Sequence, residues 1–370
     1  MTNDIAKNSA REAGASGQCV PRREPWNESD GFYERPRSHR IHLGDSQDSA
    51  TTRVRSVTRS RDLYQTPLRM TSASDQSAAN ADVWTVQRIL EWTAGFLKQK
   101  GIESPRLEAE LLLAYARKCP RIRLYTDFGS PLTDTERATM RELVQRRAKR
   151  EPLAYIVGAR EFYGRSFEVG RGVLIPRPET ESLIDACLDR IPKDVPRRIV
   201  EVGFGSSCIA ITLAKQRPLC SVTATDISDK AMEIAARNVA RHDVGGRVTL
   251  LAGDILQPVI ALAAHFDGLV SNPPYIRDDE RETLQPEVVQ HEPLEALFAG
   301  EDGLSVVRRI IEQAPAVLKP GAFIALEVDP SQCEAVASLL IAGGFQATTV
   351  KRDLNGNERI VEAVLGMPSP

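Results

Sequence analysis

The residues with the clearest chemical potential are Asn272, Pro273, Pro274 and Tyr275, which follow the apolar stretch 266–270. Such a stretch is typical of a buried strand, so the four residues lie where the strand must end. Consecutive prolines lack N–H groups and fix φ, which makes the loop stiff. A stiff loop can present the carbonyls of Asn272 and Pro273 and the Asn272 amide to both hydrogens of a planar NH2 group, while Tyr275 covers its face.

Methylation of an amide or exocyclic amino nitrogen needs this arrangement, because the lone pair is delocalised and becomes available only when the two hydrogens are steered. We therefore predict that Asn272, Pro273 and Tyr275 are catalytic and that Pro274 joins them in binding the substrate. A plain Pro-Pro turn after a strand is the structural alternative.

A second loop with chemical potential runs from Gly203 to Ser207 and follows the predicted strand segment 199–202. Glycine lets the backbone approach a ligand closely, and doubly wound folds bind ligands at the carboxyl ends of their strands. We expect Ser207 to have a helical backbone and its hydroxyl to help cap the next helix. The alternative is a strained Ser207 with positive φ.

Three acidic residues accompany three successive predicted strand ends. Glu201 would place negative charge near the amino and sulfonium groups of S-adenosyl-L-methionine (AdoMet). Asp226 can take two ribose hydroxyls, and Asp254 can accept from the adenine amino group with Ile255 against the ring. Each acid alone is more often a helix cap or a loop end, but three at one edge favour a cofactor site. The predicted AdoMet-binding residues are Glu201, Gly203, Phe204, Gly205, Ser206, Ser207, Asp226, Asp254, Ile255 and Asn272. A missing third glycine argues against NAD.

The elements that position these residues alternate between strand and helix. Strands are predicted at 198–202, 221–225, 248–251, 266–270 and 323–328, with helices at 206–216, 228–241, 303–318 and 331–342. Alternation predicts a doubly wound, mostly parallel sheet. Asn355-Gly356 between 347–352 and 359–364 is a hairpin signal. A mostly parallel seven-stranded sheet with a C-terminal antiparallel hairpin is the α/β fold of the class I AdoMet-dependent methyltransferases.

The region before this alternation divides into three parts. Residues 1–80 have few large apolar residues and no persistent period, so we predict a disordered extension. Residues 81–150 carry three helical patterns, the third opened by a Thr133–Glu136 capping box, and form a helical domain. Residues 151–180 form a linker with a β-hairpin, and 181–366 the methyltransferase domain. Arg177, between two prolines, is either an ion-pairing strut or a wall of the site.

The composition excludes several classes of protein. The net charge of −2 over 370 residues gives no overall basic field for nucleic acid. No apolar run approaches the roughly 20 residues of a membrane helix. Six scattered cysteines and five isolated histidines form no metal-binding spacing. We expect a cytoplasmic enzyme with no metal, no membrane contact and no direct nucleic-acid partner.

Taken together, these residues resemble the HemK/PrmC family, the peptide chain release factor glutamine methyltransferases, over residues 83–366. The most specific matching segments are 160–162, 174–181, 271–276, 292–297, 300–303, 351–354 and 358–359. The resemblance implies methyl transfer from AdoMet to the side-chain amide nitrogen of the glutamine in the Gly-Gly-Gln motif of release factors. It also implies that Gly203–Ser207, Asp226 and Asp254–Ile255 hold the cofactor, that Asn272–Tyr275 hold the glutamine, and that the helical domain helps to dock the release factor.

The chain departs from the family in the glycine loop. The family usually has Asp-x-Gly-Thr-Gly-Ser/Thr-Gly, whereas this chain has Glu201, Phe204 and Ser207 at three of those positions. The changes bear on the tightness of AdoMet binding more than on the class of reaction. Two other functions stay open at this point: a DNA adenine-N6 methyltransferase, which would need a basic recognition region and a base-flipping pocket, and a non-catalytic binding module with a decayed loop.

Overall fold

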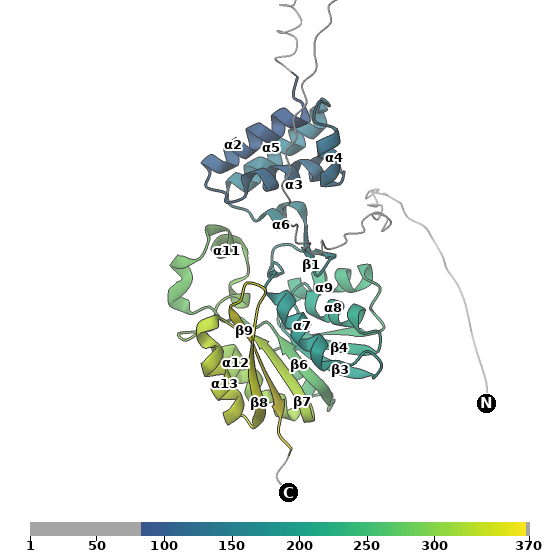
Figure 1. The fold of residues 1–370 in the computed structure, drawn as a ribbon, viewed down its shortest axis with the longest axis vertical. Coiled ribbons are helices and arrows are strands. Elements are labelled where there is room, and N and C mark those ends of the chain that lie inside the picture. The colour runs from purple at the N-terminus through teal and green to yellow at the C-terminus, as the bar shows by residue number, and fades with distance from the viewer. Residues whose placement is uncertain (1–82, 368–370) are drawn as a thin grey trace, which may run out of the picture. The chain divides into compact units, whose positions relative to one another are not determined.

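A seven-stranded sheet is the centre of the structure, a computed structural model that describes residues 83–367 (Figure 1). The strand order is β5-β4-β3-β6-β7-β9-β8. The strands are β3 (Arg197–Val202), β4 (Cys220–Asp226), β5 (Val248–Ala252), β6 (Phe266–Ser271), β7 (Leu318–Glu327), β8 (Phe345–Arg352) and β9 (Glu358–Leu365). Pairs from β5 to β7 are parallel, and β9 runs antiparallel to β7 and β8. The predicted fold class is confirmed. The predicted disorder of residues 1–80 lies outside the described residues.

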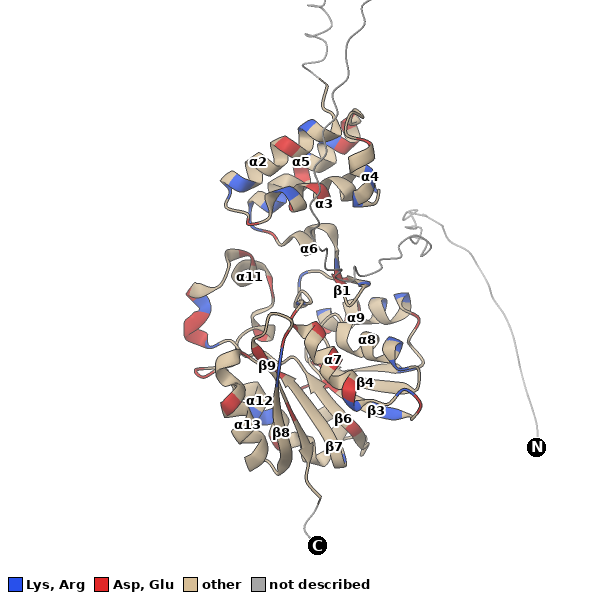
Figure 2. Ribbon diagram, in the orientation of Figure 1, with Lys and Arg blue, Asp and Glu red and all other residues tan. Residues whose placement is uncertain are grey.

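Successive strand residues face opposite sides of the sheet, and each side has its own core. In β3, Ile199 packs in the cluster that includes α7, α8 and α9, whereas Val200 packs in the cluster that includes α12 and α13. These helices are α7 (Thr180–Arg190), α8 (Cys208–Gln216), α9 (Asp229–Arg241), α12 (Ser305–Gln313) and α13 (Cys333–Ala342), and the one-turn α10 (Gln257–Ile260) joins the second cluster. Charged residues lie mostly on helices and loops, while the strands are largely uncharged (Figure 2).

The helical region before the sheet has a separate hydrophobic core. It comprises α2 (Val86–Gln99), α3 (Pro105–Arg117), α4 (Arg121–Thr126) and α5 (Asp134–Ala148). Leu90, Leu112 and Leu143 are among its buried residues. The predicted capping box is present at the start of α5, where Thr133 and Glu136 bond reciprocally. No pattern in the sequence predicted α4, because six residues are too few to show a helical period.

The chain between the helical region and the sheet forms α6 (Leu153–Val157) and the predicted hairpin, which consists of β1 (Ala159–Phe162) and β2 (Arg165–Glu168). Phe162 and Phe167 of this hairpin are buried in the same cluster as α7 and α8. The hairpin therefore contributes to the core of the sheet domain. After β6 the chain forms three short helices, η1 (Asp278–Thr283), α11 (Pro286–His291) and η2 (Leu294–Ala296). Two more, η3 (Ala314–Ala316) and η4 (Pro330–Gln332), flank β7.

Candidate active site

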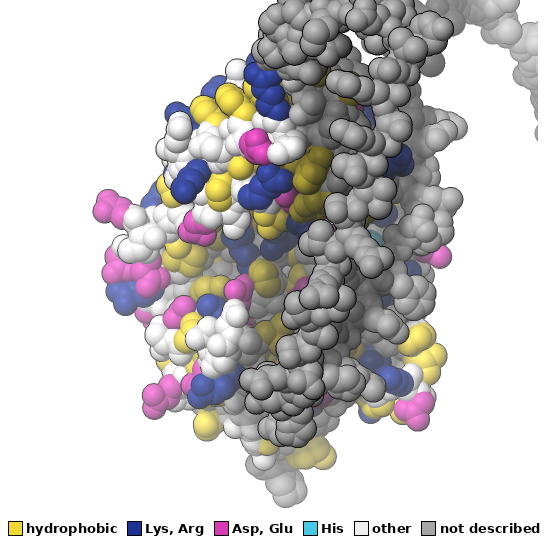
Figure 3. Space-filling view, turned by 45° about the horizontal axis from the view of Figure 1, so that its top comes forward, with side chains coloured by type: hydrophobic (Ala, Val, Ile, Leu, Met, Phe, Trp, Pro, Cys, Tyr) yellow, Lys and Arg dark blue, Asp and Glu magenta, His cyan; other side chains and the backbone are white. Residues whose placement is uncertain are grey.

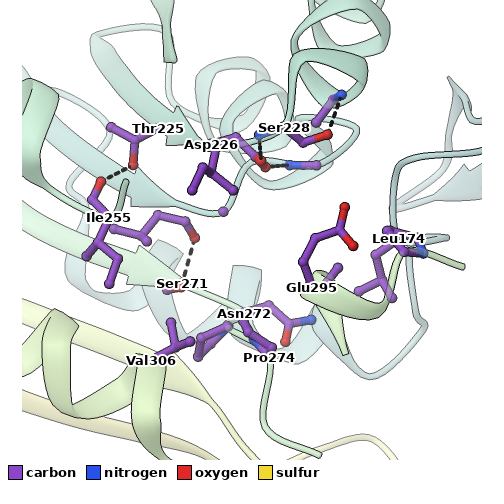
Figure 4. Close-up of a pocket in the computed structure, with 18 of the residues that line it drawn as sticks. Leu174, Thr225, Asp226, Ser228, Ile255, Ser271, Asn272, Pro274, Glu295 and Val306 are labelled. Atoms are coloured by element: carbon purple, nitrogen blue, oxygen red, sulfur yellow. Dashed lines mark hydrogen bonds between the residues drawn. The ribbon is translucent and has the colours of Figure 1, made fainter. Parts of the chain in front are cut away.

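A cleft of about 850 Å³, its open mouth included, lies at the carboxyl ends of β3, β4, β5 and β6. The side chains of Asp226, Ile255, Asn272 and Glu295 come from different loops and converge on this space (Figure 4). The convergence follows from the parallel sheet, because loops after parallel strands share one edge.

The loop after β3 gives the cleft a backbone wall. Gly203 has φ +76° and Gly205 φ +50°, conformations that glycine adopts without strain. Gly203 N–H donates to the Thr225 carbonyl at 2.8 Å, and Gly205 N–H donates to Asp226 Oδ2 at 2.8 Å. A Cβ at either glycine would meet no neighbouring atom within 4 Å, so the open space begins directly at this backbone.

Ser207 corrects one of our expectations. It has φ +62° and ψ 26°, in the left-handed region, and it makes no side-chain capping bond to α8. Its hydroxyl is buried and has no hydrogen-bond partner among the described residues. The expected helical, capping Ser207 is therefore wrong. The tight turn between Gly205 and α8 forces a positive φ, which a residue with a Cβ adopts at a cost of about 1–3 kcal/mol.

Asp226 ends β4 and faces the cleft with a partly satisfied carboxylate. Besides the bond from Gly205, its Oδ1 accepts from Ser228 N–H at 2.9 Å. Burial raises the pKa of Asp226, whereas these backbone hydrogen bonds lower it. Each carboxylate oxygen has a second lone pair, so the group can still accept two hydroxyl hydrogens from a ligand.

The loop after β5 places Asp254 and Ile255 on the wall of the cleft. Ile255 has φ +50°, an outlier for a β-branched residue, and its carbonyl accepts from the Thr225 hydroxyl at 2.6 Å. Asp254 pairs with Arg309 of α12, which also lines the cleft. The sequence carried no signal for Arg309, since its place beside Asp254 depends on how α12 packs on the sheet.

The Asn272–Tyr275 loop is fixed to its neighbours by side-chain hydrogen bonds. The Ser271 hydroxyl donates to the Val202 carbonyl at 2.8 Å, which joins the ends of β6 and β3. Asn272 Nδ2 donates to Thr180 Oγ1 at 3.0 Å. The Gln332 amide donates to the Tyr275 carbonyl at 2.9 Å. Asn272, Pro273 and Pro274 line the cleft.

Tyr275 and four of the predicted cofactor residues do not line the cleft. Burial first, and then the nearby Glu327, raises the pKa of Tyr275 to about 12. Glu201 is fully buried, with one oxygen accepting from Ala210 N–H at 3.0 Å and the other unpartnered within the described chain. Burial raises the pKa of Glu201 well above its ordinary value, which favours the neutral carboxyl. The side chains that lie in the core or behind the loop are those of Glu201, Phe204, Ser206 and Ser207. Binding roles for these residues stay predictions.

Arg177 is the predicted strut or wall, and the structure shows it as a strut. Its guanidinium bonds Glu292 Oε1 at 2.6 Å, and the other oxygen of Glu292 accepts from Ile175 N–H at 3.1 Å. Glu292 is buried, so this pair joins the segment around Leu174 to the segment that carries Glu295, and both segments line the cleft.

Glu295 is a cleft residue that no local pattern in the sequence indicated. It adds negative charge that raises the pKa of Asp226, and its carboxylate projects into the cleft (Figure 4). It lies within the family-like segment 292–297, so the resemblance was the signal that pointed to it. Among residues 83–367, no helix is long and apolar enough to cross a membrane.

The sheet order, the glycine turn after β3 and the ligand-accessible acids after β4 and β5 define a class I AdoMet-dependent methyltransferase. Family models agree with this class: a PrmC N-terminal domain matches residues 88–158, and a methyltransferase small domain matches residues 184–297.

Relatives over most of the chain show the particular family. The release factor glutamine methyltransferase of Geobacter sulfurreducens is 43% identical over 285 residues, covering 77% of this chain and 98% of that protein. The one of Rhodopirellula baltica is 41% identical over 291 residues, covering 76% and 97%. The chain belongs to the release factor glutamine methyltransferase family, and it is a methyltransferase. A solved methyltransferase from Pyrococcus furiosus is 19% identical with a TM-score of 0.42, covering 56% of this chain and 91% of that chain.

Proposed function

We propose that this chain transfers the methyl group of AdoMet to the side-chain amide nitrogen of the glutamine in the Gly-Gly-Gln motif of peptide chain release factors. The observation that carries the proposal is the stiff Asn272–Tyr275 loop beside the cleft, in a chain whose relatives bear the name of this activity. A release-factor substrate would place the reaction in the cytoplasm, where translation ends.

The residues of the cleft fit the cofactor in shape and charge. The open backbone of Gly203 and Gly205 leaves room for a ligand at the sheet edge. The free lone pairs of Asp226 suit ribose hydroxyls, and Ile255 offers an apolar surface for a base. Glu295 gives negative charge that suits a ligand with a sulfonium and an ammonium group. When bound, AdoMet supplies a methyl group on a positively charged sulfur.

The substrate amide would bind at the Asn272–Tyr275 loop. An amide nitrogen is a poor nucleophile, since its lone pair is shared with the carbonyl. The Asn272 Oδ1 and the loop carbonyls can accept the two N–H hydrogens, which orients the NH2 group and favours localisation of the lone pair. The new N–C bond would form as the S–C bond to the methyl group breaks, which leaves the sulfur as a neutral thioether. The nitrogen would give up one hydrogen as a proton to water, so the product keeps a neutral amide.

Charge supports a protein substrate over DNA. The basic end of α5 is neutralised by its neighbours: Arg146 pairs with Glu151 at 2.8 Å, and Arg147 pairs with Glu108. Acidic and basic side chains are interspersed on the face drawn in Figure 3. A DNA adenine methyltransferase would instead be expected to gather basic side chains beside its cleft.

The test is transfer of radiolabelled methyl from AdoMet to a purified release factor. The matched substrate control is the same factor with the motif glutamine changed to alanine, and duplex DNA is assayed in parallel. We expect label only in the release factor that keeps the motif glutamine. Label in DNA would replace the proposal by the DNA methyltransferase, and no label together with no AdoMet-dependent rise in melting temperature would favour a binding module.

A further inference from the structure

Asn272 has a partner on the side away from the cleft. Its Nδ2 donates to the hydroxyl of Thr180, the first residue of α7, at 3.0 Å. Thr180 is 3% exposed and does not line the cleft. The Asn272 amide that makes this contact is the one that would face the substrate. Thr180 can therefore determine whether the oxygen or the nitrogen of that amide points toward the substrate.

Glu327 continues this chain of hydrogen bonds. It ends β7, and the pairing of Ser271 with Leu326 between β6 and β7 brings Glu327 beside Asn272. Glu327 lies near Thr180, whose hydroxyl can donate to the carboxyl and so lowers the pKa of Glu327, against the rise that burial causes. Glu327 is 1% exposed, and its Oε2 has no partner among the described residues. A nearly inaccessible carboxyl that lacks a full set of partners indicates a role other than packing.

The donors and acceptors along this chain have a fixed polarity. A hydroxyl has one hydrogen to donate, and an ionised carboxylate can only accept. When Glu327 is ionised, Thr180 must donate to it and can only accept from Asn272. The amide of Asn272 is then held with its nitrogen toward Thr180 and its oxygen free to accept from a substrate.

We propose that Thr180 and Glu327 are positioning residues for methyl transfer, which hold the Asn272 amide with its oxygen toward the substrate NH2 group. The inference rests on the proposed function, since it assigns a purpose to the orientation of Asn272. If Glu327 is protonated, it can donate to Thr180, and Thr180 can donate to Asn272 Oδ1. The amide then turns over and meets the substrate NH2 with its own hydrogens, which is unproductive.

The surroundings of Glu327 place its change of protonation near neutral pH. Burial raises the pKa of Glu327 to about 7, with Thr180 and Arg359 lowering it and Glu179 and Asp353 raising it further. The neighbouring Tyr275 has its own pKa raised to about 12, so it stays neutral over the same range. The productive orientation is therefore gained as pH rises through neutrality.

The kinetic test compares Thr180→Val, Thr180→Ser and Glu327→Gln with the wild type, and Thr349→Val on the edge strand β8 is the matched control. We expect Thr180→Val to lower kcat about tenfold, the value of one hydrogen bond, with the AdoMet Kd within about twofold. Thr180→Ser should keep most of kcat because it keeps the hydroxyl. The wild-type kcat should rise with pH through neutrality, and Glu327→Gln should lack that rise. Equal losses in the Val and Ser variants, or a pH rise that survives in Glu327→Gln, would overturn the proposal.

A second measurement does not need activity. With asparagine labelled by nitrogen-15, the NH2 signals of Asn272 are identified by their loss in Asn272→Ala. We expect them to shift as pH crosses neutrality in the wild type and to stay constant in Glu327→Gln and Thr180→Val. Shifts that persist in both variants, or that are missing from the wild type, would overturn the positioning role. Shifts as expected in a protein that methylates no release factor would keep the hydrogen-bond chain and reject the proposed function.

Discussion

Two loops meet at the carboxyl edge of the sheet, and they are held in different ways. The proposed substrate loop, 271–275, is fixed by hydrogen bonds to distant elements: the Ser271 hydroxyl donates to the Val202 carbonyl, the Asn272 amide donates to Thr180, and the Tyr275 carbonyl accepts from Gln332. Gly303 adds a close contact, because a Cβ there would lie 2.2 Å from the Tyr275 carbonyl oxygen. The fixed φ of its two prolines and these contacts with neighbouring elements together hold the loop in one shape.

The proposed cofactor loop, 203–207, is held mainly through its backbone N–H groups. Gly203 and Gly205 bond through their N–H groups to the end of β4, and both have positive φ. Ser207 has positive φ as well but lacks the freedom of glycine, and its hydroxyl has no partner within the described residues. The difference teaches that substitutions at the substrate loop should act through lost partners, and those at the cofactor loop through backbone strain.

The largest expected effect concerns Glu327, the buried carboxyl that ends β7 beside the end of β6. A carboxyl whose pKa rises from 4.5 to about 7 on folding binds its proton more tightly in the native state. Its contribution to stability is complete below about pH 4.5 and is lost as pH rises to about 7, by up to about 3 kcal/mol. Glu327→Gln should remove that loss from the free energy of unfolding, measured by denaturation at several pH values. Glu334→Gln, an exposed carboxyl on α13, is the control, and parallel pH curves for Glu327→Gln and the wild type would contradict the prediction.

The next effect is on turnover. Asn272→Ala removes the amide that would orient the substrate NH2, an interaction of about 1.5–3 kcal/mol in a desolvated site, or roughly 10- to 100-fold in rate. Turnover should fall by that factor while the AdoMet Kd, measured by calorimetry, changes less. Gln346→Ala removes an exposed amide on β8 as the control. Near wild-type turnover would show that the substrate loop does not need Asn272.

A smaller effect of opposite sign is expected at the cofactor loop. Ser207→Gly should relieve the strain of a positive φ at some cost in chain entropy, a net gain of about 0.5–1 kcal/mol in the free energy of unfolding. AdoMet binding should tighten several-fold, because a larger fraction of the cofactor-free protein should have this loop in the backbone conformation that binds AdoMet. Ser207→Ala separates the causes: it removes the unpaired hydroxyl and keeps the strain. If Ala and Gly variants gain equally, the hydroxyl rather than the backbone is responsible.

The smallest effect is expected far from both loops. A chain that begins at Met70 keeps every residue that lines the cleft. Since the segment 1–69 has few large apolar residues to add to a core, we expect an unchanged melting temperature and unchanged methyl transfer. A clear fall in either would assign that segment a structural or functional role.

The sequence by itself determined the order of elements and the positions of the two loops. Apolar segments such as 266–270 and the helix cap at Thr133 depend on nearby residues, so local patterns predicted them. The Asn355-Gly356 turn likewise predicted the hairpin of β8 and β9. The place of Asp226, Asp254 and Asn272 at one edge followed from the rule that parallel strands align their carboxyl ends.

Only the tertiary structure decided which side chains meet at that edge. Thr180 and Asn272 are 92 positions apart, and Arg309 and Asp254 are 55 apart, so no local period joins them. The side chain of Glu201 is fully buried in the core. The alternation along β3 predicts which face of the sheet this side chain lies on, but it does not predict how deeply the neighbouring helices bury it. The positive φ of Ser207 is set by the turn that must connect β3 to α8 across a fixed gap, and a serine has no sequence signature for it. Contacts between distant elements and the backbone angles of short connections depend on three-dimensional packing, which a linear pattern does not contain.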